Sequence, residues 1–313
     1  MIYGIADVGS NTVRLSIYKC EGGEIRLLMN RKVMAGLAGY VRHGALTPEG
    51  IQVACQTLQG YRSLMDNLEL PDLRVFATAS LRNISNTEEA VGAVMAATGL
   101  KVDVLSGREE AELSFRGAIQ NAGLYTGLLV DLGGGSTELV SYRERAIQTA
   151  CSLSVGSLSL FSQYVSKLHP TKEERRAIRR AVEEQLDRYV AHRIPARHIC
   201  GVGGTVRAAC KVANVMFDRP GDDRSLDREE LSEMLHRLKK PGREELRLLL
   251  KAVPERIHTL IPGLLALDTI AKVYGVQTLT ASACGVREGY LLDRVLGHGG
   301  EHPDAATPTQ REG

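Results

Sequence analysis

Residues 128–138 read Leu-Leu-Val-Asp-Leu-Gly-Gly-Gly-Ser-Thr-Glu, and this stretch decides the fold. A short apolar run that reaches Asp131 and is bounded by glycines is typical of a buried strand. The glycines let the backbone turn sharply, and successive N–H groups in such a turn form a concavity that binds anions. The stretch therefore predicts a strand that ends in a phosphate-binding loop; the alternative is a hairpin whose glycines serve only its geometry. The predicted phosphate-binding residues here are Gly133, Gly134, Gly135, Ser136 and Thr137.

A second copy of this plan opens the chain: an apolar run, an aspartate, a glycine loop with hydroxyl groups, and another apolar run. Asp7 takes the place of Asp131, and in both copies a polar turn leads on to a third apolar segment. A repeat on this scale predicts two similar α/β lobes that face each other, residues 1–124 and residues 125–297. The first loop consists of Gly9, Ser10, Asn11 and Thr12.

Helices and strands alternate along the rest of the chain. Apolar periodicity and helix-capping residues predict helices over 48–68, 86–97, 106–121, 170–193, 206–215, 226–239, 243–252, 257–275 (interrupted at Pro262) and 283–296. Strands are predicted over 2–6, 13–18, 25–33, 72–77, 102–105, 146–153, 197–202 and 278–282, and in a hairpin over 128–140. Gly203, Gly204 and Thr205 join a strand to a helix, so their N–H groups can bind an anion. Residues 298–313 are predicted to be a disordered tail.

Two neighbouring acids follow the strand at 102–105. Ser106 and Glu109 have the Ser-x-x-Glu spacing of a capping box, which gives Glu109 a structural role. Glu110 is left over, in the first helical turn just past the carboxyl end of a strand, where ligand sites of α/β sheets gather. Taken alone, Glu110 is either a site residue or a surface acid favoured by the helix dipole.

The composition is that of a globular protein without an obvious polymer-binding or membrane character. The chain has 313 residues, a formal net charge of +2, no tryptophan and only 4% aromatic residues, which argues against binding single-stranded nucleic acid through stacked bases. No signal peptide and no membrane-spanning run is evident. The six cysteines lie far apart without a Cys-x-x-Cys pair, so we interpret them as reduced, and the protein as cytoplasmic.

The predicted helix at 170–193 carries an unusual density of charge. Its arginines at 175, 176, 179 and 180 could follow a polyanion, but acids such as Glu173 and Glu183 are interleaved with them. Alternating charges along a helix are typical of a solvated face, and we favour that interpretation from the sequence.

Six motifs in order make the chain resemble the exopolyphosphatase / guanosine pentaphosphate phosphohydrolase (Ppx/GppA) family, over roughly residues 2–296. The resemblance implies two duplicated lobes of the actin-like ATPase and sugar kinase fold (ribonuclease H-like), with a cleft between them. It also implies hydrolysis of a terminal phosphoanhydride, in a short two-domain member without the C-terminal helical domain of longer relatives. The motifs are Asp7–Thr12, Ala77–Arg82, Ser106–Ala111, Asp131–Leu139, Gly201–Thr205 and Gly285–Gly289.

The resemblance assigns roles to individual residues. Glu110 matches the general base of the family and would deprotonate the attacking water, while Arg82 would neutralise the phosphoryl oxygens. Asp131 and Glu138, with Asp7 as a further candidate, would hold Mg²⁺, whose preferred ligands are oxygen atoms. Arg14 and Arg287 are candidates for contacting a distal phosphate or a guanosine base; for Arg14 an outward position on an amphipathic strand is the alternative.

The substrate and the reaction class stay open at this level. Inorganic polyphosphate and pppGpp present the same terminal group, and we expect exopolyphosphatase activity with either polyphosphate or guanosine penta/tetraphosphate as partner, no nucleic-acid polymer and no membrane. The alternatives are a phosphotransferase (kinase) of the same fold and a module that binds (p)ppGpp or polyphosphate without turnover. The resemblance also favours a homodimer.

Overall fold

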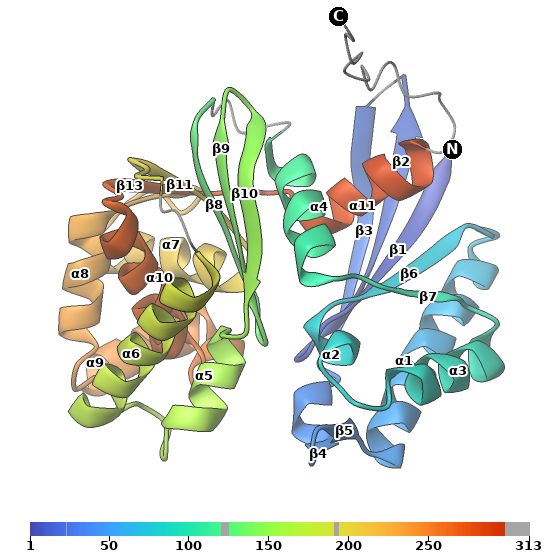
Figure 1. Ribbon diagram of the computed structural model, residues 1–313, viewed down its shortest axis with the longest axis horizontal. Helices are drawn as coiled ribbons and strands as arrows, with labels where there is room; N and C mark the ends of the chain where they lie inside the picture. The colour runs from blue at the N-terminus through green and yellow to red at the C-terminus, as the bar shows by residue number, and fades with distance from the viewer. Residues whose placement is uncertain (23, 120–124, 191–193, 298–313) are drawn as a thin grey trace, which may run out of the picture.

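The computed structural model describes residues 1–22, 24–119, 125–190 and 194–297. They form two α/β lobes, each built on one mixed sheet, with helices α4 and α11 between them (Figure 1). In the N-terminal lobe the strand order is β3-β2-β1-β6-β7. Its elements are β1 Ile2–Val8, β2 Val13–Glu21, β3 Glu24–Val33, the hairpin β4 Val41–Arg42 and β5 Ala45–Leu46, α1 Pro48–Asn67, β6 Leu73–Ala77, α2 Ala79–Arg82, α3 Thr87–Thr98, β7 Val102–Val104 and α4 Gly107–Ile119.

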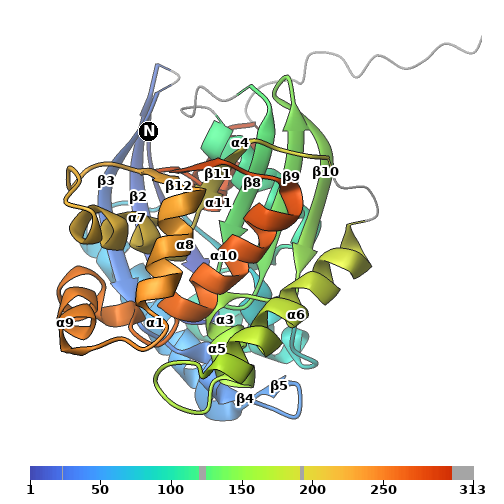
Figure 2. The same cartoon turned by 90° about the vertical axis from the view of Figure 1, so that its left-hand side faces the viewer.

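The C-terminal lobe repeats this plan with a sheet of order β10-β9-β8-β11-β13-β12. Helices α5, α6, α8 and α10 lie together on the face of this lobe that Figure 2 turns toward the viewer. Its elements are β8 Gly127–Leu132, β9 Thr137–Arg143, β10 Ala146–Leu153, α5 Ser157–Tyr164, α6 Lys172–Tyr189, β11 His198–Val202, α7 Gly204–Met216, β12 Ser225–Asp227, α8 Arg228–Arg237, α9 Arg243–Ala252, α10 Leu260–Tyr274 and β13 Thr278–Ala281.

The internal repeat predicted from the two glycine loops is confirmed by the strand register. In the N-terminal lobe Val8 pairs with Val13 across an antiparallel hairpin, and the Gly9 N–H donates to the Thr12 carbonyl at 3.0 Å. In the C-terminal lobe Leu132 pairs with Thr137, and Gly133 donates to Ser136, also at 3.0 Å. The two loops therefore close equivalent hairpins, one in each lobe, and each loop follows a central strand of its sheet.

Each lobe has its own hydrophobic core, but the chain returns to the first lobe at its end. Helix α11, Val286–Tyr290, continues as a π-helical segment, Leu291–Leu296, and packs along α4. Tyr290 and Leu291 are buried in one cluster with Tyr3, Tyr18 and other side chains of the first sheet. Figure 1 shows α11 crossing α4 beside the N-terminal strands.

Three local expectations differ from the structure. Pro262 does not interrupt its helix, because it lies in the first turn of α10, where the missing N–H would have no helical partner. Asn86 occupies the N-cap position of α3, but its side chain bonds to the backbone of Leu46 instead of capping the helix. The short strand β12 includes the first two residues of the helix predicted over 226–239. Helix α5 lies in a segment to which we assigned no element.

Other expectations concern features outside the sheets and helices. Cys20, Cys55, Cys151, Cys200 and Cys210 are free thiols, and three of them, Cys55, Cys200 and Cys210, are buried. The predicted tail at 298–313, and the ends of the helices predicted to reach 121 and 193, lie outside the described residues. No helix in the described part of the chain combines the length and the apolar character that a membrane span requires.

Candidate active site

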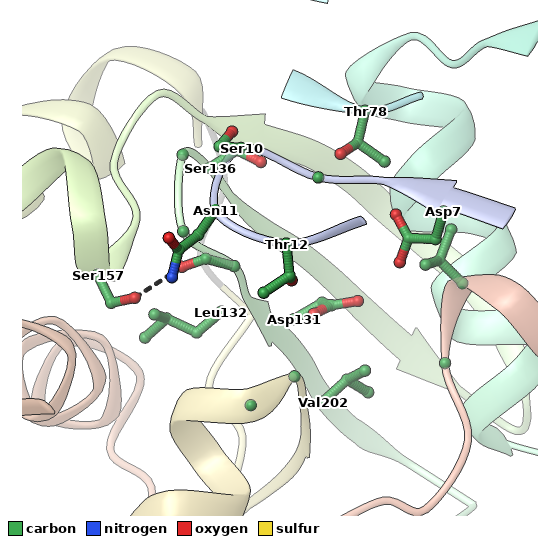
Figure 3. A pocket seen from close by; sticks show the side chains of 18 of the residues that line it. Asp7, Ser10, Asn11, Thr12, Thr78, Asp131, Leu132, Ser136, Ser157 and Val202 are labelled. Atoms are coloured by element: carbon green, nitrogen blue, oxygen red, sulfur yellow. Dashed lines mark hydrogen bonds between the residues drawn. The ribbon is translucent and has the colours of Figure 1, made fainter. Parts of the chain in front are cut away.

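A cavity of about 160 Å³ lies between the lobes, where the two glycine loops meet. Figure 3 shows Asp7, Thr12 and Asp131 around it, with β1 and its loop on one side and β8 with the second loop on the other. Both lobes therefore contribute to one site, as the duplicated motif predicts. Residues that line it include Asp7, Gly9, Ser10, Asn11, Thr12, Arg14, Glu110, Asp131, Gly133, Gly134, Gly135, Ser136, Glu138, Gly203, Gly204, Arg207, Arg256 and Arg287.

The two loops lie directly against each other. A Cβ atom added to Gly135 would lie 2.7 Å from the Ser10 hydroxyl oxygen, and one added to Gly134 would lie 3.8 Å from the Asn11 Cβ. In Figure 3 the Asn11 side chain points across to Ser157, at the start of α5. The lobes are thus closed around the cavity in this structure, which suits a site that must exclude bulk water.

Helix α5, which we did not predict, holds the second loop in place. Its first N–H groups donate to the loop carbonyls: Ser157 to Gly133, and both Leu158 and Ser159 to Gly134, each at 2.9 Å. The contact is so close that a Cβ on Gly156 would lie 2.4 Å from the Gly134 carbonyl oxygen. This helix N-terminus therefore orients the loop and is not itself free to bind an anion.

Glu110 lies where the sequence places it, at the first turn of α4, and it lines the cavity. The predicted capping box is present: the Ser106 N–H donates to Glu109 at 2.9 Å, and the Glu109 N–H donates to the Ser106 hydroxyl at 3.2 Å. Glu110 is only 7% exposed, so the alternative of a surface acid does not hold. Burial raises the pKa of Glu110 well above that of an ordinary glutamate, and the neighbouring Glu138 raises it further, whereas Arg82 lowers it.

Arg82 contacts this carboxylate and does not line the open cavity. Its Nη1 lies 2.6 Å from the Glu110 Oε2 and also donates to the Leu105 carbonyl at 3.1 Å. Its Nη2 lies 3.9 Å from a Glu138 oxygen. The guanidinium is therefore placed to orient and partly neutralise two buried acids. Its contact with phosphoryl oxygens stays a prediction.

Two of the candidate metal ligands, Asp131 and Glu138, are buried carboxylates, whereas Asp7 is partly exposed. Asp131 and Glu138 are direct neighbours in the β8–β9 register. Ser114, one helical turn beyond Glu110 on α4, donates to Asp131 at 2.5 Å, and Ser152 donates to Glu138 at 2.8 Å. Burial raises the pKa of Asp131, and it raises the pKa of Glu138 to about 7 with a further contribution from Asp131.

Asp7, the third candidate ligand, lines the same cavity from the N-terminal lobe. Burial raises the pKa of Asp7 to about 6, although Arg287 and Arg14 oppose this shift. The described residues contain no cluster of three or more metal-ligating side chains. The carboxylates nevertheless fit Mg²⁺, which is commonly held by one or two carboxylates, with water and substrate phosphates completing its octahedron. A bound cation would also offset the cost of burying unpaired carboxylates.

Four arginines also line the cavity: Arg14, Arg207, Arg256 and Arg287. Arg287 lies 4.0 Å from Asp7 and donates to the Ser16 hydroxyl at 2.9 Å. Among the described residues, neither Arg14 nor Arg207 forms an ion pair with a carboxylate. Burial lowers the pKa of each, and the positive charge of Arg287 lowers it further. Gathering like charges in this way is costly, and a polyanionic ligand would relieve the repulsion.

Arg207 and Arg256 were missed by the sequence analysis. Arg207 lies in the first turn of α7, two residues past the Gly201–Thr205 motif, so its place beside that motif was a usable signal. Arg256 belongs to a short 3₁₀ segment, Pro254–Arg256, that carries no motif. Its guanidinium covers Gly204, where an added Cβ would lie 1.9 Å from Nη2, so this glycine makes room for the arginine.

Two predicted phosphate-binding hydroxyls are not brought to the cavity wall. Thr137 is fully buried and donates to the Val155 carbonyl at 2.5 Å. Thr205 is 1% exposed, and its hydroxyl has no hydrogen-bond partner among the described residues. In the second and third loops, therefore, the glycines and Ser136 face the cavity, while these threonines lie in the interior.

A duplicated α/β fold with two glycine loops, buried carboxylates and clustered arginines in one cleft defines a phosphate-processing protein. Residues 16–298 match the Ppx/GppA phosphatase family, and the chain belongs to that family. A solved Ppx/GppA family member from Aquifex aeolicus is 24% identical with a TM-score of 0.80, over 96% of this chain and 99% of that chain. An exopolyphosphatase from Cytophaga hutchinsonii is 21% identical with a TM-score of 0.83, over 95% and 98%. These structures confirm the predicted fold class.

Proposed function

We propose that the chain is an exopolyphosphatase that releases orthophosphate from the end of inorganic polyphosphate and also accepts pppGpp. The observation that carries the proposal is Glu110, which is buried and lines the cavity from the start of α4. Its neighbour Glu109 is already used in the helix cap and in an ion pair with Arg294. Membership of a phosphatase family supports the reaction class.

The charge distribution supports an orientation for the substrate. The terminal phosphoryl group would lie between the loops at Gly9–Thr12 and Gly133–Ser136, whose N–H groups suit an anion. The remaining phosphates would extend toward Arg14, Arg207 and Arg256, which lack carboxylate partners among the described residues. Guanidinium groups hold phosphate oxygens two at a time and suit this role.

The reaction itself is an in-line displacement. Water attacks the terminal phosphorus, its proton passes to the Glu110 carboxylate, and the bond to the bridging oxygen breaks. The leaving phosphate carries away the electron pair of that bond, and the arginines neutralise its charge. Catalysis then depends mostly on position and charge stabilisation, and the closed contact between the loops supports both.

Mg²⁺ is the proposed cofactor. Asp131 and Glu138 would hold it from the C-terminal lobe, with Asp7 approaching from the N-terminal lobe. When bound, the ion would neutralise charge on the phosphate oxygens. Ser114 and Ser152 fix the orientation of its two principal carboxylates.

The test compares two adjacent substitutions with the same change of charge. Glu110→Gln should lower kcat for phosphate release from tripolyphosphate with Mg²⁺ by about 10²–10⁴-fold, the usual contribution of a general base. Glu109→Gln should retain activity within about two-fold, because glutamine also satisfies a capping box. Equal phosphate release by wild type and Glu110→Gln would remove Glu110 from the proposed role.

Product analysis separates the alternatives. Phosphorus NMR with short polyphosphate, long polyphosphate and pppGpp in competition should show orthophosphate from the preferred substrate without any acceptor. A product that forms only when an acceptor is added would identify a phosphotransferase. Tight binding of ppGpp without hydrolysis of any anhydride would identify a binding module.

A further inference from the structure

A second basic feature lies away from the cavity, on the outer side of the C-terminal lobe. Helices α6, α8 and α10 lie side by side there (Figure 2), and α10 contacts both of the others. An open groove of about 980 Å³ runs between the first half of α6 and the end of α8, with Leu265 and Asp268 of α10 at its base. Its charged lining residues are Lys172, Glu173, Arg175, Arg176, Arg179, His236, Lys239, Lys240 and Asp268.

Two of the cations serve the fold. Arg175 donates to the carbonyls of Leu238 and Pro170, which ties the start of α6 to the end of α8. Arg179 pairs with Asp268 at 2.5 Å, so the acid at the base of the groove is already neutralised. These bonds correct our interpretation from the sequence, in which all four arginines of α6 belonged to a solvated face.

The remaining cations have no such role. Lys172, Arg176 and Lys240 are exposed and form no hydrogen bond or ion pair with the described residues, and Lys239 contacts only His236. Only one groove carboxylate, that of Glu173, lies among them without a cationic partner. The groove therefore carries a positive charge that the protein does not compensate.

We propose that this groove binds the distal part of a long inorganic polyphosphate chain. An open channel with separate cations along its walls suits a linear polyanion, which gains affinity by releasing counterions at each contact. A compact ligand would instead require polar groups that converge on one point, whereas the unpaired cations of the groove are spread over α6 and the residues after α8. The choice of polyphosphate as occupant rests on the proposed function, whereas the anion site rests on the groove alone.

The experiment measures binding of long-chain polyphosphate and of tripolyphosphate to the full chain carrying Glu110→Gln, so that substrate is not consumed. The groove variant adds Lys172→Gln, Arg176→Gln and Lys240→Gln. The control variant removes the same charge from exposed arginines outside the groove, with Arg180→Gln, Arg188→Gln and Arg247→Gln. All six side chains are exposed, so neither triple change disturbs a core.

The groove variant should bind long chains at least about ten-fold more weakly at about 50 mM salt, with the dependence of log affinity on log salt reduced by about 2. Binding of tripolyphosphate should be the same in the groove variant and the control variant. When the same triple changes are made in a chain that keeps Glu110, the two variants should also hydrolyse tripolyphosphate equally. Equal loss of long-chain affinity in both variants would overturn the groove. Duplex DNA and anionic vesicles serve as further probes. If the groove variant lost affinity only for one of these, the groove would belong to another polyanion and the proposal would be overturned. Groove-dependent binding without any hydrolysis by wild type would overturn the proposed function and leave the groove in place.

Discussion

At the scale of single residues, the site contains two unusual groups of side chains. The pKa values of its buried acids are raised, and two of its arginines, Arg14 and Arg207, form no ion pair with the described residues. Glu110, Glu138 and Asp131 share one buried region: Glu138 and Asp131 raise the pKa of Glu110, and Asp131 raises the pKa of Glu138. Arg82 is the cation in direct contact with two of them, at 2.6 Å and 3.9 Å. Its charge therefore lowers the pH at which Glu110 becomes an effective base, against the larger effects of burial and Glu138.

Removing that charge should move the pH profile. The Glu110 pKa is raised by burial and lowered by Arg82, so Arg82→Gln raises it further, and the deprotonated base forms only at higher pH. We expect the acidic limb of kcat/KM to move up by about one to two pH units, the usual effect of a close opposite charge. Arg82→Lys should largely restore the limb. An unchanged limb in Arg82→Gln would show that this arginine does not tune the base.

At the scale of elements, the loops work because neighbouring helices hold them. Helix α5 binds the carbonyls of the second loop, and α4 carries both Glu110 and Ser114, which orients Asp131. Helices α4 and α11 in turn touch through their backbones. A Cβ on Gly117 would lie 2.0 Å from the Gly285 carbonyl oxygen, and one on Gly289 would lie 1.8 Å from that of Leu113.

Gly156→Ala tests the support of the second loop. The new methyl would meet the Gly134 carbonyl at 2.4 Å and must displace either the loop or α5. We expect a loss of at least about 10²-fold in kcat/KM, as for misplacement of a reacting group by about 1 Å. Gly60→Ala on α1, where an added Cβ meets nothing within 4 Å, is the control. Wild-type kinetics in Gly156→Ala would show that the loop does not depend on this contact.

Gly117→Ala tests the crossing of α4 and α11. The methyl collides with backbone and not with a flexible side chain, so we expect destabilisation of about 1–3 kcal/mol or more in urea unfolding. Gly92→Ala on α3 faces open space and should instead stabilise the chain by up to about 1 kcal/mol. Equal stability of the two variants would contradict the close packing of the helices.

The sequence predicted most elements because their signals are local. The capping box at Ser106 and Glu109 formed as expected, and so did the strand at Ala146–Leu153. Helix α5 was missed because its first residues, Ser-Leu-Ser-Leu, alternate with period two, and its N-cap is Gly156, without a capping side chain. Arg256 could not be predicted, since tertiary packing of the Pro254–Arg256 segment against Gly204 brings it to the cavity. Thr137 was predicted to bind phosphate but lies in the interior, because successive residues of a strand point to opposite faces of the sheet.

At the scale of the whole molecule, charge is distributed around the mouth of the cleft as well as inside it. Lys32 of the N-terminal lobe lies 3.9 Å from Glu255 of the C-terminal lobe. Arg14 and Arg256 are close enough to Lys32 to lower its pKa, although burial is the larger cause. Glu255 therefore places a negative charge beside Lys32, Arg14 and Arg256, the cations that the proposed substrate would contact.

Neutralising this acid should improve substrate capture. In Glu255→Gln we expect KM for tripolyphosphate to fall by up to about five-fold at low salt, the upper range for an exposed ion pair, with kcat little changed. The gain should fade as salt is added, because salt screens exposed charges. Glu244→Gln on α9 is the control for net charge. An equal fall of KM in both variants would indicate a general charge effect and not an interaction at the cleft mouth.

The return of α11 to the first sheet has a consequence for how the protein is made. Tyr290 and Leu291 fill an apolar cluster with Tyr3 and Tyr18, yet they leave the ribosome more than 160 residues after α4 ends. At about 5–20 residues per second, the N-terminal lobe waits roughly 9–35 s with part of its core exposed. The C-terminal lobe, although it is synthesised second, has its own core before that last helix arrives. We therefore expect the half that emerges first to be the one completed last, and the half that depends most on chaperones during translation.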